Sequence, residues 1–263
     1  VRHLVSHPRF EMNALNEALL LSSKKGRVEI VKELLKDSRF EGATLNKAFI
    51  LASRKHQTGV AKEILKDPRF DFAVNQVFKK AIIDDHLELV KVLLKDPRVD
   101  PSANHNEAIT KACLLGRVRI VGELLKDLRV NPADNFNLAI RQACMFGHVK
   151  VVKELLKDPR VDPAAENNEA IRSATSSLKV VRLLLKDPRV DPSANQNEAI
   201  RQAILYKRIQ VVKELLKDSR VNSLANENEA ICLFHAYGYS DITDELLQDP
   251  LARDLLNQYV HQA

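Results

Sequence analysis

The chain has 263 residues, of which 45% are hydrophobic and 29% are charged, a balance typical of a packed core with a solvated surface. No apolar run approaches the roughly eighteen residues of a membrane span, and no basic start is followed by an apolar stretch, as in a signal peptide. The 41 Lys and Arg residues are interleaved with 35 Asp and Glu residues, so the net charge of +6 indicates a mixed surface rather than a basic tail.

The cysteine and glycine contents narrow the compartment and the fold class. Three cysteines, Cys113, Cys144 and Cys232, are too few and too widely spaced for a disulfide framework or a zinc motif. We therefore expect an intracellular, reducing compartment, the cytoplasm, with the nucleus as an alternative. Seven glycines and no tryptophan argue against a sheet-rich fold, which uses glycine in turns and aromatic residues in strands. The composition predicts an all-α protein.

A repeated motif predicts the architecture. The sequence Leu-Leu-Lys-Asp, or a near copy, recurs at steps of 29 to 31 residues. Its copies begin at Leu34, Ile64, Leu93, Leu124, Leu155, Leu184, Leu215 and Leu246. One helix pair cannot enclose a core, whereas stacked pairs share a continuous one. We therefore predict a single elongated domain, an α-solenoid of about eight helix-turn-helix repeats.

The two ends of the chain differ from the interior repeats. Residues 1–10 align with residues 31–40, so the chain begins inside the second helix of an earlier unit, as an excised fragment or a half-repeat cap. We expect this half-repeat or cap over residues 1–12, the repeats over residues 13–249, and a capping helix with a more polar outer face over residues 250–263.

An asparagine precedes the apolar pattern of each first helix. It recurs as Asn16, Asn46, Asn75, Asn106, Asn137, Asn168, Asn197 and Asn228. An asparagine side chain can accept a hydrogen bond from an otherwise unpaired backbone N–H of the first helical turn. The pattern therefore predicts an N-cap at each of these positions.

The fifth repeat illustrates the expected helix pair. The buried face of its first helix is predicted to be a narrow stripe of Ile140, Ala143, Cys144 and Gly147. After a tight turn, the apolar stripe of its second helix is predicted to be Val149, Val152, Leu155 and Leu156. Asp158-Pro159 ends this helix, because proline disfavours helical geometry in the residue before it.

This unit resembles the ankyrin repeat. The resemblance lies in Ala139-Ile140-Arg141, Ala143-Cys144, Gly147-His148, Val151-Val152 and Leu155-Leu156. Two features depart from the family pattern: the opening is Asn-Glu-Ala-Ile rather than Thr-Pro-Leu-His, and a shorter Asp-Pro-Arg-Val-Asp-Pro connection replaces the glycine-containing β-hairpin finger. The resemblance implies a protein-interaction scaffold with a reduced finger surface. Tetratricopeptide repeats have a similar period but need tyrosine and small residues at spacings absent here.

The sixth repeat is shorter than the fifth. Ala170 and Leu184 are 14 residues apart, against 16 for Ala139 and Leu155, so two residues are missing around residues 175–177. We predict that the first helix ends early there, that the stack bends, and that amide exchange is faster than in the fifth repeat.

The sequence carries no phosphate loop, nucleophile elbow or His-Glu-x-x-His motif. His86 and His148 fall at repeat turns, where the family uses histidine for backbone hydrogen bonds, and Cys113 and Cys144 fall in the small-residue stripe of the core. Cys232 is expected on the opposite stripe, with no histidine fixed beside it by spacing. We therefore predict no enzymatic activity, cofactor, metal or small-molecule substrate.

A series of arginines follows the second helices in step with aspartates two positions earlier. The arginines are Arg39, Arg69, Arg98, Arg129, Arg160, Arg189 and Arg220. One interpretation is a row of guanidinium groups that binds phosphates, which makes nucleic acid or another polyanion the alternative ligand. The favoured interpretation is a ladder of Asp–Arg pairs that also complements the helix C-terminal dipoles.

The candidate site is the stripe that the first helices leave unburied along an inner groove. Its residues are predicted to be Lys24, Lys25, Arg54, Lys55, Lys79, Lys80, Lys111, Leu115, Arg141, Phe146, Arg201, Tyr206 and Tyr237. The early part is basic and the later part apolar and aromatic, so the expected partner is an extended or helical protein segment with acidic residues and an apolar anchor. Alternatively, about half of the apolar side chains, among them Leu114 and Met145, pack between neighbouring first helices.

Overall fold

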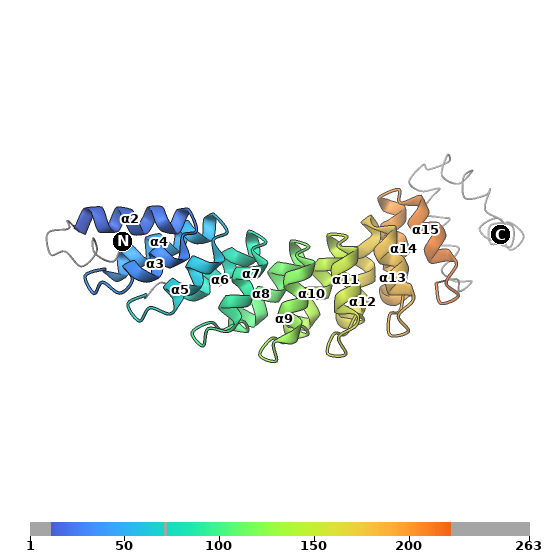
Figure 1. Ribbon diagram of the computed structural model, residues 1–263. Helices are drawn as coiled ribbons and strands as arrows, with labels where there is room; N and C mark the ends of the chain where they lie inside the picture. Colours follow the sequence, from blue (N-terminus) through green and yellow to red (C-terminus); the bar gives the residue numbers. More distant parts are fainter. Residues whose placement is uncertain (1–11, 71–72, 222–263) are drawn as a thin grey trace, which may run out of the picture. The chain divides into compact units, whose positions relative to one another are not determined.

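The computed structural model describes residues 12–70 and 73–221, and these residues form α-helices in pairs, with no strand among them. The chain divides into two compact units between Pro101 and Ser102. The helices of the first unit are α2 (Met12–Lys24), α3 (Val28–Leu34), α4 (Gly42–Arg54), α5 (Thr58–Leu65), α6 (Val74–Ile83) and α7 (Leu87–Leu94) (Figure 1). The predicted all-α class is confirmed.

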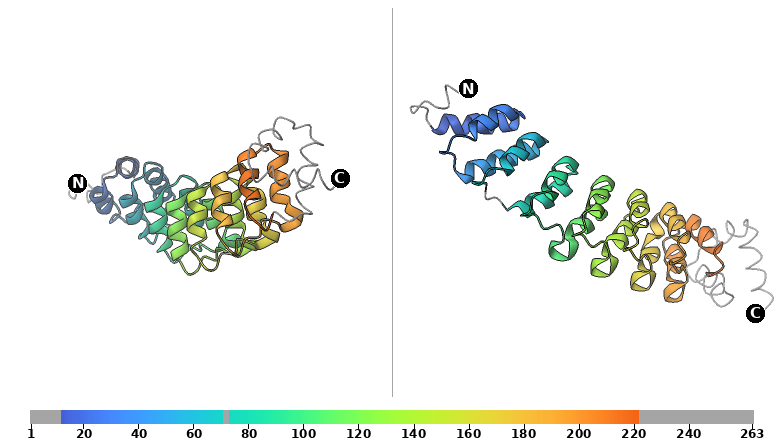
Figure 2. Two further views of the ribbon diagram at one scale, coloured as in Figure 1. Left: turned by 90° about the vertical axis from the view of Figure 1, so that its right-hand side faces the viewer. Right: turned by 60° about the horizontal axis from the view of Figure 1, so that its bottom comes forward.

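The second unit holds four further pairs and one short 3-10 helix. Its helices are α8 (Ala103–Leu114), α9 (Val118–Lys126), α10 (Asp134–Met145), α11 (Val149–Leu155), α12 (Ala165–Ser173), the 3-10 helix Ala174–Ser176, α13 (Leu178–Leu185), α14 (Ala194–Leu205) and α15 (Ile209–Leu216). Within this unit, first helices pack on first helices and second helices on second helices in chain order (Figure 2). The predicted eighth repeat, the start of the chain and the capping helix lie outside the described residues.

The core follows the predicted stripe of small residues in the first helices. In α10, Ala139, Ile140, Ala143 and Cys144 are buried, but the prediction is wrong for Gly147, which follows the end of α10 in the turn and is half-buried. The predicted stripe of α11 is partly wrong, because Val151 is fully buried with Val152 and Leu155, whereas Val149 and Leu156 are half-buried. The reason is that α11 is covered by α9 on one side and α13 on the other, which the periodicity of one isolated helix does not reveal.

The N-cap prediction for the repeated asparagines is wrong. In the first unit, Asn16, Asn46 and Asn75 lie inside helices that have already begun. In the second unit, Asn137 has a φ of +58° and is the last of three consecutive residues in the left-handed region. The same three-residue turn ends at Asn106, Asn168 and Asn197. Asparagine tolerates this conformation better than most residues, which explains its place there. Asn228 lies outside the described residues.

Four of the asparagine side chains, those of Asn75, Asn106, Asn137 and Asn168, instead join consecutive repeats. The Oδ1 atom of Asn137 accepts a hydrogen bond of 2.8 Å from the backbone N–H of Asp162, 25 residues later. Asn106 accepts the equivalent bond from Asn131, and Asn75 from Asp100, also across 25 residues. Each of these four asparagines therefore fixes the connection that enters the next repeat.

The sixth repeat departs from the others as its sequence predicts. The bond between Asn168 and Asp191 spans 23 residues rather than 25. The first helix α12 has 9 residues against 12 in α10, and the 3-10 helix Ala174–Ser176 takes up the last turn. The predicted early end of this helix is confirmed, because the shorter chain leaves no residues for another α-helical turn.

Candidate functional site

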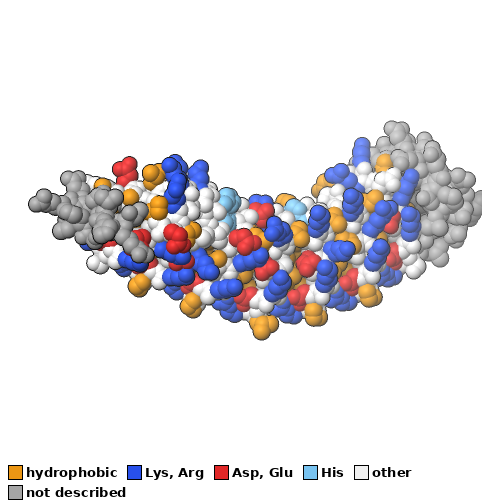
Figure 3. Space-filling model, in the orientation of Figure 1, with side chains coloured by type: hydrophobic (Ala, Val, Ile, Leu, Met, Phe, Trp, Pro, Cys, Tyr) orange, Lys and Arg blue, Asp and Glu red, His pale blue; other side chains and the backbone are white. Residues whose placement is uncertain are grey.

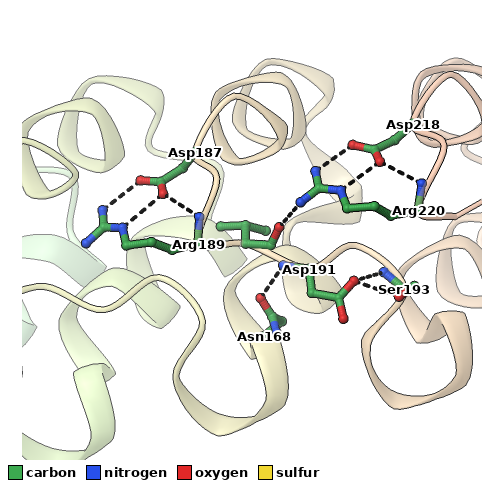
Figure 4. A network of polar contacts seen from close by, with 8 residues as sticks. Asn168, Asp187, Arg189, Asp191, Ser193, Asp218 and Arg220 are labelled. Carbon is green, nitrogen blue, oxygen red and sulfur yellow. Dashed lines mark hydrogen bonds and ion pairs between the residues drawn. The ribbon is translucent and has the colours of Figure 1, made fainter.

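The repeated Asp–Arg pairs form within one connection, and their arginines also bond the preceding repeat (Figure 4). Arg189 donates to both carboxylate oxygens of Asp187, at 2.9 and 2.7 Å, and its Nη1 atom donates to the Val161 carbonyl of the preceding repeat at 2.8 Å. The hydrogen bonds from Arg189 lower the pKa of the Asp187 carboxyl, against the opposing effect of burial. Three of the five N–H groups of this guanidinium are therefore already bonded within the protein.

The same arrangement recurs along the series. Arg69, Arg98, Arg160 and Arg220 each donate to a carbonyl of the preceding repeat, at 2.5 to 3.0 Å. Arg69, Arg98 and Arg160 also reach the carbonyls of Leu35, Leu65 and Leu125, at the C-terminal ends of α3, α5 and α9. The prediction that the arginines complement helix C-terminal carbonyls is confirmed for these three.

The first unit is basic at the C-terminal ends of its first helices α2 and α4. Lys24 and Lys25 at the end of α2, and Arg54 and Lys55 at the end of α4, are exposed. Lys80 of α6 is exposed and forms an ion pair of 2.7 Å with Asp84 on the same helix. The neighbouring candidate Lys79 is half-buried, so it is less available than predicted.

A cavity of about 220 Å³ opens between the first helices α4 and α6 of this unit. Its lining residues are Phe49, Ile50, Ser53, Arg54, Gln76, Val77, Lys80, Ala81, Asp84, His86 and Leu89. Few close backbone contacts join α4 and α6, and α6 has only 10 residues against 13 in α4. Sequence reasoning identified Arg54 and Lys80 but missed the cavity, since its walls look like ordinary core positions of three separate helices.

The turn beside this cavity holds a pair of stacked histidines. The rings of His56 and His86 lie 4.3 Å apart with an interplanar angle of 12°. His86 is buried, its Nδ1 atom accepts a bond of 3.2 Å from the Leu89 N–H, and its Nε2 atom is buried without a hydrogen-bond partner among the described residues. Burial, followed by the nearby His56, lowers the pKa of His86. The predicted structural role of His86 at the turn is confirmed.

The second unit exposes apolar side chains at the C-terminal ends of two first helices. At the end of α10, Met145 is 54% exposed and Phe146 is 52% exposed. At the end of α14, Leu205 is 40% exposed and Tyr206 is 61% exposed. The alternative that Met145 packs between first helices is therefore wrong. Leu114 and the candidate Leu115, at the end of α8, are half-buried, as that alternative expected for Leu114.

The remaining candidates of the second unit are less available. Arg141 is only 17% exposed and forms an ion pair of 2.7 Å with Glu169 of the next first helix. Arg172 forms the equivalent pair with Glu198, also at 2.7 Å. Arg201 is half-buried, with Nη2 3.3 Å from the carbonyl oxygen of Asn195. Lys111 is half-buried as well. The predicted stripe is therefore exposed only in its last turn, because arginine–glutamate pairs between neighbouring helices cover its middle.

Among the charged residues that the structure describes, Figure 3 shows Lys and Arg side chains interspersed with Asp and Glu side chains. Cys113 and Cys144 are fully buried free thiols, and burial raises the pKa of both. Tyr237 and Cys232 lie outside the described residues. Within residues 12–70 and 73–221, no group of three or more His, Cys, Asp or Glu side chains could hold a metal ion.

No helix in the described part of the chain has the length and apolar content needed to cross a membrane.

Comparison with known proteins agrees with the repeat geometry. The family profile for ankyrin repeats, which covers three copies, matches residues 78–167 and residues 140–225. Together these matches span more than half of the chain. No curated protein matches the chain.

Proposed function

The chain belongs to the ankyrin-repeat family, and on that premise we propose that it is a non-catalytic scaffold that binds a protein segment through its first-helix surfaces. Ankyrin repeats are typically protein-binding modules, and binding of this kind needs no cofactor or reactive side chain. The two buried thiols are poor nucleophiles, because burial disfavours the thiolate form.

The observation that carries this proposal is the exposure of Met145 with Phe146 and of Leu205 with Tyr206. The two pairs occupy equivalent positions, at the ends of α10 and α14. Exposure of large apolar side chains to water is unfavourable, and exposed apolar patches tend to mark interaction sites. Aromatic residues are also enriched among the few residues that carry most binding energy at interfaces. We refer to Met145, Phe146, Leu205 and Tyr206 as the apolar surface.

In the first unit, the basic C-terminal ends of α2 and α4 favour acidic residues in the partner. Lys24, Lys25, Arg54 and Lys55 are exposed there, and charged groups at an interface mainly set the orientation and rate of association. The acidic residues of a partner would contact these basic helix ends, and its apolar anchors would contact the apolar surface. Charge reversal at Lys24, Lys25 and Lys55 is then expected mainly to slow association and to make it less sensitive to salt.

Selection of a displayed random-peptide library on the intact protein tests the proposal. Selected peptides are expected to lose affinity for a Phe146→Ala/Tyr206→Ala double variant by about 2 kcal/mol or more, without a change in its unfolding transition. Leu128→Ala is the control, because Leu128 is 94% exposed but follows the second helix α9 and does not lie at the C-terminal end of a first helix. Unchanged affinity in the double variant would contradict the proposal.

The alternative ligand, a nucleic acid or another polyanion, is distinguished by its salt response. Such binding weakens linearly with the logarithm of salt concentration, with a slope set by the number of phosphates contacted. We expect no such binding to heparin or duplex DNA at about 0.15 M salt, because the edge arginines already donate to aspartates and backbone carbonyls. Tight, steeply salt-dependent binding would favour the alternative.

A further inference from the structure

We propose that the cavity between α4 and α6 receives one apolar side chain of a partner segment that is acidic on both sides of that side chain. This inference rests on the proposed function and names the chemistry that the first unit recognises. The cavity is smaller than the roughly 300–1,000 Å³ of sites for drug-sized molecules, which fits a single side chain better than a free ligand.

Apolar side chains form one part of the cavity wall, and the Ser53 hydroxyl and His86 Nε2 are polar atoms of the lining that are buried without a hydrogen-bond partner among the described residues. Phe49 of α4, Val77 and Ala81 of α6 and Leu89 of α7 are all buried and line it. Besides facing the cavity, α4 packs on α2 and α5, and α6 packs on α7, so these contacts support both walls when no partner is bound. An apolar side chain placed there would leave water without displacing core residues.

Positive charge surrounds the mouth of the cavity. Arg54 and Lys80 line it and are exposed, and Arg54 has no ion-pair partner in the described part of the unit. Asp84 is the acidic residue of the lining, and its carboxylate is paired with Lys80. Lys55 is exposed beside Arg54 and Asp85 is exposed beside Asp84, so the cations Arg54, Lys55 and Lys80 outnumber the carboxylates Asp84 and Asp85, and the mouth favours carboxylates on both sides of an inserted apolar residue.

Synthetic peptides test both halves of the inference with the intact chain. The probes are fluorescein-labelled peptides with four acidic residues on each side of a central residue, which is Leu, Phe or Gly. Their affinities are measured by fluorescence anisotropy at low salt. We expect the peptides with central Leu or Phe to bind about tenfold or more tightly than the Gly peptide. Equal affinities, or no binding of the acidic peptides, would overturn the inference.

A variant that fills the cavity shows where the central residue binds. Ser53→Leu replaces a hydroxyl that is buried without a hydrogen-bond partner by a side chain that occupies the cavity. It is expected to remove the difference between the Leu and Gly peptides. Ser38→Leu is the matched control, because Ser38 is exposed in the same unit and outside the cavity lining, and leucine already stands at the equivalent position 128.

Two further measurements keep the test decisive. Arg54→Glu is expected to weaken all the acidic peptides alike, and a labelled Ile50 methyl group is expected to shift only with the Leu and Phe peptides. If the Leu and Phe peptides bind tightly but the Ile50 methyl signal does not shift, the cavity is not the binding site. This outcome is informative even if Ser53→Leu does not fold. The proposed function fails separately, when library peptides do not depend on Phe146 and Tyr206.

Discussion

The imidazole ring of His148 lies against Gly116 of the preceding repeat, so closely that a Cβ atom on Gly116 would come within 2.7 Å of its Nδ1 atom. The Nε2 atom of the same ring lies 2.9 Å from the Leu114 carbonyl oxygen, to which it donates a hydrogen bond. In the first unit, the turn after α4 has His56 at the position of Gly116, at a φ of +57°. There the next histidine, His86, stacks on the ring of His56, and its Nε2 atom has no partner among the described residues.

Substitution of Gly116 by alanine should therefore destabilise the second unit by about 2 kcal/mol, from the positive φ of +70° and from displacement of the His148 ring. Gly122→Ala is the matched control with the opposite sign. Gly122 lies within α9 and a Cβ atom there meets nothing within 4 Å, so alanine should stabilise by about 0.5–1 kcal/mol. Urea unfolding measures both, and equal effects would contradict the packing argument.

Substitutions of Asn137 should separate its conformation from its hydrogen bond. Asn137→Gly tolerates the φ of +58° but leaves the Asp162 N–H without its acceptor, which should cost about 1–2 kcal/mol. Asn137→Ala should cost about 1 kcal/mol more, because it also strains the backbone. Equal unfolding free energies of the two variants would contradict the prediction that alanine strains the backbone at this position.

The stability of the protein should fall as the pH drops below about 6.5, the pKa of an unperturbed histidine. Burial lowers the pKa of His86 in the folded protein, so the unfolded chain takes up a proton first, and the free energy of unfolding falls until the folded pKa is passed. His86→Asn can keep an acceptor for the Leu89 N–H but does not titrate. Urea unfolding at a series of pH values should show a shallower decline of the unfolding free energy for this variant than for the wild type. An identical decline would contradict the assignment to His86.

Arg160→Lys should destabilise by about 1–2 kcal/mol near neutral pH, because lysine cannot bond Asp158 and the carbonyls of Val130 and Leu125 together. The Arg160 hydrogen bonds lower the pKa of Asp158, so this stabilisation is present above about pH 4 and is lost as the pH falls through the folded pKa. Wild type and variant should therefore converge in acid. The exposed Lys153→Ala serves as the control, with an expected effect within about 0.5 kcal/mol.

Amide hydrogen exchange should be faster at residues 175–178 than at residues 146–149. The turn of the fifth repeat is closed by bonds from Gly147 to the Cys144 carbonyl and from His148 to the Ala143 carbonyl, at 3.0 and 2.9 Å. The sixth repeat replaces that turn with a 3-10 helix, whose hydrogen bonds have poorer geometry. Exchange followed by mass spectrometry or NMR tests this, and equal protection of the two turns would show that the deletion is accommodated without local loosening.

Much of this protein could be predicted from the sequence because the relevant signals are local. The repeat period, the small-residue stripe with Cys144, and the Asp–Arg pairs all depend on residues within a few positions of one another. The two missing residues of the sixth repeat likewise predicted the short α12. The exposed Phe146 and Tyr206 followed from helical periodicity, since they lie opposite the buried face.

The tertiary structure decided the features that depend on contacts between repeats. The pattern around Asn137 looks like an N-cap, but its acceptor oxygen bonds Asp162 of the next connection, 25 residues away. Arg141 looked available on an exposed stripe until Glu169 of the next helix was placed beside it. The cavity between α4 and α6 exists because those two helices pack loosely. Helical periodicity determines which face of a helix is buried, but only the packing of neighbouring repeats determines which polar groups are satisfied and where space remains.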